Sequence, residues 1–212
     1  MLTPKHVFDR LFENFGNQHW WPVSSENEQF EIIIGAILTQ NTSWKNVEKV
    51  LETLKKEGLI HPEKMIEIQT KKLAELIRPS GYYNQKAERL KIVSQFLLEN
   101  DLAAMGVEWM RKKLLEIKGV GPETADSIIL YAFNKPSFVV DLYTKRIFSR
   151  LGLINNNSSY NEVKQFFETN LEKDVELFQE FHALIVEHAK SFCKKKPDCE
   201  NCFLRKNCKK LI

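Results

Sequence analysis

The chain has 212 residues, of which 43% are hydrophobic and 28% charged, and its formal net charge is +3. This balance excludes a disordered chain, a collagen and a coiled-coil rod. No apolar run reaches the roughly 18 residues that a membrane span needs, and the first residues contain no apolar signal core. We therefore expect a cytoplasmic protein with one large domain or two small ones.

Apolar residues recur at helical spacing along nearly the whole chain, which predicts an all-α fold. The first helix is expected to begin with Thr3 as its N-cap and Pro4 in its first turn. A second helix over residues 30–38 is apolar on nearly every side and should be buried, although its three consecutive isoleucines also fit a strand. Further helical stripes lie within residues 47–54, 90–97 and 177–185. Residues 78–84 and 155–159 are predicted turns or loops.

A pair of glycines separates two predicted helices at Gly119-Val120-Gly121. The helix before it is expected to have an apolar face made of Trp109, Leu114 and Leu115. Two glycines so close together permit a tight reversal with positive φ. The amides of Val120 and Gly121 are expected to point outward at a helix N-terminus, which suits a phosphate. On its own, such a pair is usually only a turn.

An apolar run over residues 138–140 is predicted to be extended and to place Asp141 at the start of a helix. Taken alone, this position fits an ordinary N-cap.

All four cysteines lie between residues 193 and 208, with five, two and five residues in the gaps. Four thiolates this close in sequence indicate a metal or iron–sulfur site. Zinc sites with four cysteines usually have two C-x2-C pairs and this block has one, but the spacing leaves zinc open.

The same part of the chain is basic. Residues 190–210 hold eight lysines or arginines and two acidic residues, a charge of +6, so the remainder of the chain carries −3. A basic block of this kind indicates contact with a polyanion, or else a solvated tail.

Together these segments resemble the helix-hairpin-helix DNA glycosylases of the endonuclease III superfamily. The resemblance covers about residues 20–210 and is carried by residues 35–42, 81–87, 119–125 and 140–141 and by the cysteine block. Residues 20–22, 78–81 and 181–182 point further, to the bacterial 3-methyladenine DNA glycosylase III branch.

The resemblance implies a two-lobed helical fold. A six-helix barrel with the hairpin would span residues 24–135, and a second lobe would combine residues 1–23 with 136–212. That lobe would carry a [4Fe-4S] cluster in the loop 193–208, and the substrate pocket would lie between the lobes. The expected protein is a monomer associated with the prokaryotic nucleoid, and its partner is double-stranded DNA containing a damaged base.

The resemblance also assigns roles to residues. Asp141 matches the catalytic aspartate. The cluster ligands would be Cys193, Cys199, Cys202 and Cys208. The substrate pocket would include Trp20, Trp21, Trp44, Glu123 and Lys190, although tryptophans are more often core residues. DNA would be contacted by Gln40, Tyr82, Gly119, Val120, Gly121, Lys145 and Arg146. Gln40 would fill the space left by the flipped base and Tyr82 would be the wedge, or both are ordinary interhelix residues. Lys145 and Arg146 contact phosphate or face solvent.

Two departures from the family pattern bear on activity. Bifunctional members carry a Schiff-base lysine where this chain has Glu123, and a carboxylate cannot replace it. The first cysteine gap is one residue shorter than in endonuclease III. We therefore expect a monofunctional base-excision-repair glycosylase that hydrolyses the N-glycosidic bond of an alkylated purine such as 3-methyladenine. The alternatives are a glycosylase for uracil, thymine or hypoxanthine, a bifunctional glycosylase and AP lyase, and a non-catalytic iron–sulfur DNA-binding module.

Overall fold

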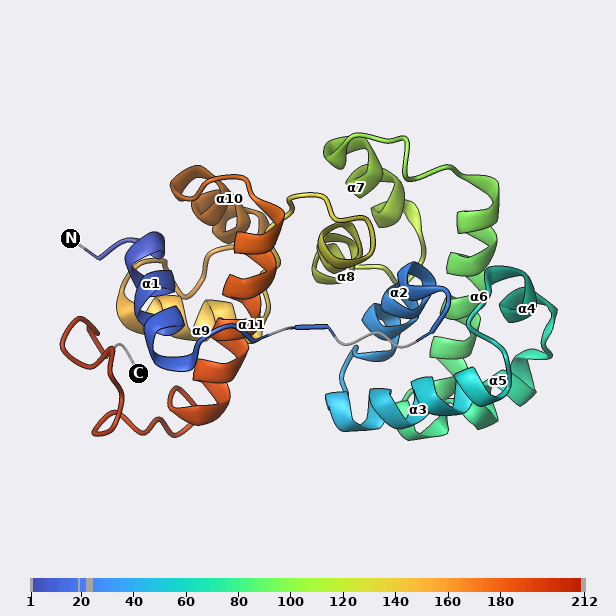
Figure 1. Ribbon diagram of the computed structural model, residues 1–212, viewed down its shortest axis with the longest axis horizontal. Coiled ribbons are helices and arrows are strands. Elements are labelled where there is room, and N and C mark those ends of the chain that lie inside the picture. Colours follow the sequence, from blue (N-terminus) through green and yellow to red (C-terminus); the bar gives the residue numbers. More distant parts are fainter. Residues whose placement is uncertain (1, 19, 22–24, 211–212) are drawn as a thin grey trace. The chain divides into compact units, whose positions relative to one another are not determined.

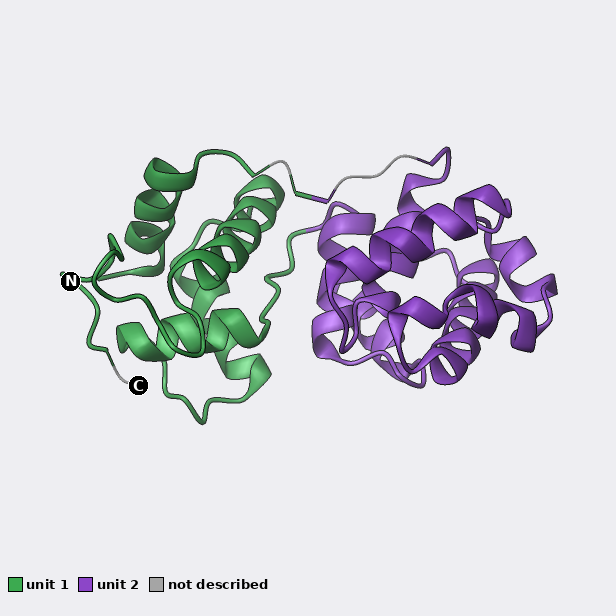
Figure 2. Ribbon diagram, turned by 90° about the horizontal axis from the view of Figure 1, so that it is seen from below, with its two compact units in different colours: residues 1–20, 136–212 green, residues 21–135 purple. Residues whose placement is uncertain are grey.

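The computed structural model describes residues 2–18, 20–21 and 25–210. These residues form helices, turns and loops without a β-strand, which confirms the all-α fold (Figure 1). The chain divides into two compact units: unit 1 comprises residues 1–20 and 136–212, and unit 2 comprises residues 21–135 (Figure 2). Within the described ranges, no helix has both the length and the apolar character needed to span a bilayer.

Unit 1 is a bundle around phenylalanine side chains. Its helices are α1 (Pro4–Phe15), α9 (Leu142–Leu151), α10 (Tyr160–Asn170) and α11 (Val175–Ser191). The Thr3 hydroxyl accepts a hydrogen bond from the His6 amide, and Pro4 occupies the first turn, so the predicted start of α1 is confirmed. Fully buried rings from the loop before α9 and from three helices form the core: Phe138, Phe148, Phe167, Phe178 and Phe181. Phe138 stacks on Phe167 with ring centres 4.0 Å apart.

Unit 2 contains the remaining helices. They are α2 (Glu28–Leu38), α3 (Trp44–Lys56), α4 (Pro62–Glu67), α5 (Thr70–Leu76), η1 (Arg78–Ser80), α6 (Tyr83–Glu99), α7 (Val107–Glu116), α8 (Pro122–Ser127) and the π-helix η2 (Ile128–Ala132). The isoleucine run belongs to α2, which is buried from Phe30 to Leu38 and packs against α6 and η2. The helix prediction for this segment is therefore confirmed, and the strand is excluded.

The predicted apolar face of α7 is wrong in two of its three residues. Leu114 is buried, but Trp109 is 51% exposed and Leu115 is 36% exposed. Met110 and Ile117 fill the core positions instead, because the buried stripe runs through 110, 114 and 117 at helical spacing. The Trp109 ring lies beneath the ammonium groups of Lys112 and Lys113, at 4.9 and 5.6 Å from its centre.

Candidate functional site

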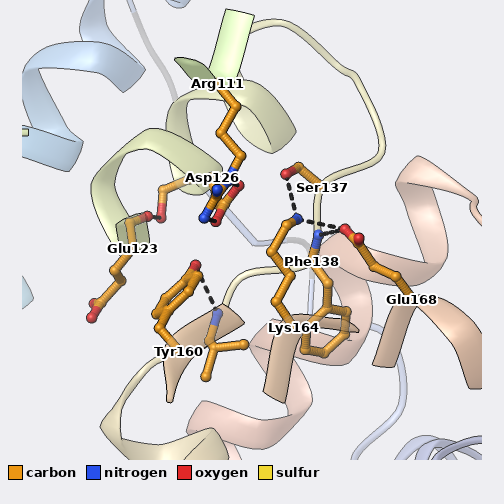
Figure 3. A network of polar contacts seen from close by, with 10 residues as sticks. Arg111, Glu123, Asp126, Ser137, Phe138, Tyr160, Lys164 and Glu168 are labelled. Carbon is orange, nitrogen blue, oxygen red and sulfur yellow. Dashed lines mark hydrogen bonds and ion pairs between the residues drawn. The ribbon is translucent and has the colours of Figure 1, made fainter. Parts of the chain in front are cut away.

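The segment that leads to Asp141 is extended and is held by side chains of α10. The Phe138 amide donates to Glu168 Oε1 at 2.9 Å, and the Val140 amide donates to the Tyr160 hydroxyl at 3.3 Å. Lys164 Nζ contacts both Ser137 Oγ and Glu168, and Figure 3 shows it between these two side chains. An extended strand without a partner strand needs such acceptors for its amides. Helix α10 thus fixes the backbone that ends at Asp141.

Asp141 is the N-cap of α9, as the sequence predicted. Its Oδ1 accepts hydrogen bonds from the Thr144 amide at 2.7 Å and from the Thr144 hydroxyl at 2.8 Å. Its Oδ2 faces the His182 ring instead, with Nε2 at 3.8 Å. The carboxyl group is thereby divided: one oxygen caps the helix, and the other is available to a neighbour. An N-cap role and a chemical role can coexist in this arrangement.

The electrostatics of the site favour an ionised carboxylate. Burial raises the pKa of Asp141, but the interaction with His182 and the two Thr144 hydrogen bonds outweigh burial, so the pKa lies below its ordinary value of 3.8. Asp141 also stands where the dipole of α9 favours negative charge. A fixed negative charge in a mostly buried position can stabilise a positive charge that develops beside it.

Three side chains follow one another near Asp141 within unit 1. His182, on α11, is 8% exposed and meets the edge of the Trp20 ring with ring centres 6.5 Å apart. The exposed Lys190, two turns further along α11, places its ammonium 5.5 Å from the centre of the Trp20 ring. His182 had no predicted site role, because a lone histidine on an apolar helix face reads as a core residue. Only the fold, which brings α11 to α9, reveals its proximity to Asp141.

Trp21 and Trp44 contact each other in unit 2. Their rings meet edge to face at 5.2 Å, and Trp21 also packs on Tyr131 at 5.0 Å. Trp21 closely covers Gly35, where a β-carbon would lie 3.0 Å from the indole. Both tryptophans are half-buried, so each combines core packing with an accessible face. Pro22, which follows them in the sequence motif, lies outside the described residues.

The glycine hairpin differs from expectation in one amide. Gly119 has φ +90°, as the predicted reversal requires, whereas Gly121 has φ −91°. The Val120 amide does not point outward: Val120 is 6% exposed, and its N–H donates to Ile117 O at 3.0 Å. The reversal closes on itself through this bond, because a tight turn pairs its own amide with the carbonyl three residues earlier.

Gln40 connects the hairpin to α6. Its Nε2 donates to Gly119 O at 3.1 Å and to Thr124 Oγ1 at 3.0 Å, and its Oε1 accepts from Arg89 Nη1 at 2.6 Å. A glutamine with three partners is held in one orientation. The hairpin, the segment after α2 and helix α6 are therefore joined by hydrogen bonds within unit 2.

The four cysteines line one cavity of about 440 Å³, together with His188 and Arg150. Arg150 Nη1 lies 3.4 Å from Cys193 Sγ, and the Lys210 amide lies 3.3 Å from Cys208 Sγ. Burial raises the pKa values of Cys202 and Cys208, and the other thiols of the block raise them further.

As a donor set, four clustered thiols with N–H groups directed at sulfur fit an iron–sulfur cluster. Their placement is looser than a closed site. Within residues 2–18, 20–21 and 25–210, no three His, Cys, Asp or Glu side chains gather closely enough to hold a metal ion.

A family model described as HhH-GPD superfamily base excision DNA repair protein matches residues 34–173. The chain belongs to this superfamily. It is accordingly a DNA glycosylase of base excision repair. The matched segment includes Gln40, the hairpin and Asp141.

The relatives of this HhH-GPD glycosylase agree with that assignment. A protein of Methanocaldococcus jannaschii, named for the DNA repair glycosylases, is 50% identical over 95% of this chain and 94% of its own. Endonuclease III of Thermotoga maritima is 32% identical over 86% and 84%.

Two solved structures have similar folds. An endonuclease III–DNA complex has a TM-score of 0.85 at 26% identity, covering 99% of this chain and 97% of that one. An H. pylori 3-methyladenine DNA glycosylase bound to 1,N6-ethenoadenine has a TM-score of 0.75 at 32% identity, covering 89% and 98%.

The remaining residues expected to act in this glycosylase are placed as follows. Tyr82 is 65% exposed and has a left-handed backbone at φ 46°. Glu123 is exposed in the first turn of α8. Lys145 Nζ donates to Ser158 O at 2.8 Å, and Arg146 Nε donates to Cys193 O at 2.8 Å. Lys145 and Arg146 therefore brace loops of unit 1 as well as carrying charge.

Proposed function

We propose that this glycosylase is monofunctional and hydrolyses the N-glycosidic bond of an alkylated purine such as 3-methyladenine. The observation that carries the proposal is the state of Asp141. Its pKa is lowered, one oxygen is held by Thr144, and the other is left for the reacting sugar. Such a group suits a reaction in which positive charge builds up on carbon.

In the proposed reaction, the damaged nucleotide is first turned out of the duplex. The bond between C1′ and the base nitrogen lengthens, its electron pair leaves with the base, and the sugar becomes a cation. The Asp141 carboxylate stabilises this cation electrostatically and orients or deprotonates the water that adds to C1′. The water supplies the hydroxyl on C1′, and its proton passes to Asp141 or to solvent.

An alkylated purine is proposed as the substrate because alkylation at N3 or N7 makes the base cationic and a good leaving group. Aromatic rings attract such a base by about 0.5–2 kcal/mol each. Trp20 already holds the Lys190 ammonium over its ring, so its face accepts positive charge. The relative named as a 3-methyladenine DNA glycosylase supports the same substrate class. The role of Trp21 and Trp44 at the base stays a prediction.

The absence of lyase chemistry is proposed from Glu123. Strand cleavage through a Schiff base needs a lysine amine at the reacting sugar, and the position that would supply it holds a carboxylate. Borohydride trapping tests this point directly. We expect no covalent protein–DNA adduct from the wild-type protein, and an adduct in high yield would establish a bifunctional enzyme.

Two further elements complete the proposal. Gln40, Tyr82 and the glycine turn would contact the DNA, with Lys145 and Arg146 attracting its phosphates, so binding should weaken strongly with salt. Cys193, Cys199, Cys202 and Cys208 would hold a [4Fe-4S] cluster, whose part would be structural. Arg146 and Arg150, on the helix that Asp141 caps, bind the Cys193 segment and would tie that loop to α9.

The test is incubation with methylated genomic DNA, followed by chromatography of the released bases. We expect free 3-methyladenine, and Asp141→Asn serves as the matched control that should release almost none. Release of uracil or hypoxanthine from suitably damaged DNA, without methylated purines, would replace the proposed substrate. Release of no base from any of these DNAs would contradict the proposed function.

A further inference from the structure

A buried lysine joins the ends of two helical segments in unit 2. Lys86, on α6, is 1% exposed, and its Nζ donates to Leu38 O at 2.8 Å and to Ser80 O at 2.7 Å. Leu38 is the last residue of α2 and Ser80 the last of η1. Carbonyl groups at helix ends lack partners within their own helix. One ammonium group thus satisfies two separate chain segments.

Each of these segments continues into a residue with an accessible side chain. Gln40 comes two residues after Leu38 and donates to Gly119 O and Thr124 Oγ1. Tyr82 comes two residues after Ser80 and exposes 65% of its surface. Because Lys86 contacts both carbonyls, the two segments lie side by side, and Gln40 links them to the hairpin. We call Gln40, Tyr82 and Gly119 the recognition surface.

The conformation of this surface is not one that the backbone adopts unaided. Tyr82 has φ 46°, a left-handed geometry that costs a non-glycine residue roughly 1–2 kcal/mol. Such strain persists only where the surroundings hold it in place. The Lys86 amide also donates to Tyr82 O at 3.0 Å, so Lys86 fixes both sides of the strained residue.

The choice of lysine here is costly, which indicates a purpose. Burial, and to a lesser degree the charge of Arg89, lowers the pKa of Lys86 from 10.5 to about 8. An apolar side chain would avoid that cost in a packed core. What only a donor can provide is a simultaneous bond to two carbonyls that belong to different segments.

We propose that Lys86 is a positioning residue for DNA binding, whose two hydrogen bonds set the spacing between Gln40 and Tyr82 so that both engage one damaged site. This deepens the proposed function and rests on it only in that these residues contact DNA. Lys86 itself touches no DNA. Its ligand is the backbone, and its effect passes through the two segments that it joins.

The test compares Lys86→Met with Lys91→Met. Lys91 lies on the same helix and also bonds a backbone carbonyl, that of Ile68, but it has no link to the recognition surface. The probes are a duplex with a tetrahydrofuran abasic-site analogue and the same duplex undamaged, measured by fluorescence polarisation at fixed salt. We expect Lys86→Met to weaken binding of the abasic duplex about tenfold or more, and Lys91→Met to change it less than twofold.

Hydrogen exchange supplies a readout that general destabilisation would not reproduce. Lys86→Met should speed exchange selectively in residues 39–42 and 80–83, and Lys91→Met should not. If Lys86→Met is unfolded by circular dichroism at the assay temperature, Lys86→Gln against Lys91→Gln carries the same comparison, with the shorter glutamine expected to retain part of the affinity.

The proposal is overturned if the folded Lys86 variant binds the abasic duplex within twofold of wild type, or if the Lys91 variant loses as much. These outcomes are independent of base release. A wild-type protein that releases no base while Lys86→Met still loses abasic-site binding would remove the proposed function and keep the role of Lys86.

Discussion

Unit 1 and unit 2 each bury one ionisable side chain at their functional segment, and in both the pKa is lowered. For Asp141 in unit 1, the lower pKa means that the surroundings favour the charged form. For Lys86 in unit 2, the lower pKa of about 8 means that the surroundings disfavour the charged form. The difference indicates that unit 1 uses its residue as a charge, and unit 2 uses its residue as a hydrogen-bond donor.

The largest expected effect concerns the pH dependence that Lys86 imposes on stability. Its pKa is about 8 in the folded protein and 10.5 in the unfolded chain, so the unfolded chain binds more protons between these values and stability rises with pH. The full shift corresponds to about 3 kcal/mol. Urea unfolding from pH 7.5 to 10.5 should show wild type gaining this much relative to Lys86→Met. A constant difference would contradict the buried-donor interpretation.

A smaller effect is expected at the hairpin. Gly119→Ala places a β-carbon at φ +90° and 2.3 Å from the Arg89 side chain, which must then move away from Gln40. We expect a loss of roughly 1–2 kcal/mol in stability and weaker DNA binding. Gly121→Ala is the matched control, because its φ is −91° and no described atom lies within 4 Å of the new carbon. Thermal unfolding of both variants would show equal losses if this distinction were wrong.

In unit 1, Thr144→Val removes one of the two hydrogen bonds on Asp141 Oδ1 and keeps the backbone one. We expect a stability loss of about 1 kcal/mol and a several-fold slower base release, because the carboxylate loses a fixed orientation. Thr144→Ser keeps the hydroxyl and serves as control. Base release by the valine variant at the wild-type rate would show that the backbone bond alone orients Asp141.

The smallest effect is the acid dependence that Asp141 contributes. Because its folded pKa is below the ordinary 3.8, its favourable contribution is complete above that pH and is lost as the pH falls through the folded value. The stability difference between wild type and Asp141→Asn should therefore be flat from pH 5 to 7 and shrink below 3.8. A difference that shrank between pH 5 and 7 would mean a raised pKa, opposite to the comparison made above.

The local features of the molecule could be predicted from the sequence. Thr3 and Pro4 mark the start of α1, and the run before Asp141 predicted an extended segment that ends in an N-cap, because caps depend on a few adjacent residues. The reversal at Gly119 follows likewise from glycine chemistry.

Long-range contacts could not be predicted in this way. Lys86 bonds Leu38 O across 48 positions, and a lysine within a helical pattern normally reads as solvent-exposed. His182 reaches Asp141 only because α11 packs against α9. The exposure of Trp109 was missed for the opposite reason: its apolar character suggested burial, while Met110 took the core position.

Single-turnover base release by Asp141→Asn tests the central claim most directly. The asparagine keeps the shape of the side chain and removes its charge. With the methylated substrate that wild type cleaves, we predict a rate at least about 100-fold lower, while affinity for the abasic-site duplex stays within threefold of wild type. A rate within threefold of wild type would contradict the claim that the Asp141 charge stabilises the sugar cation.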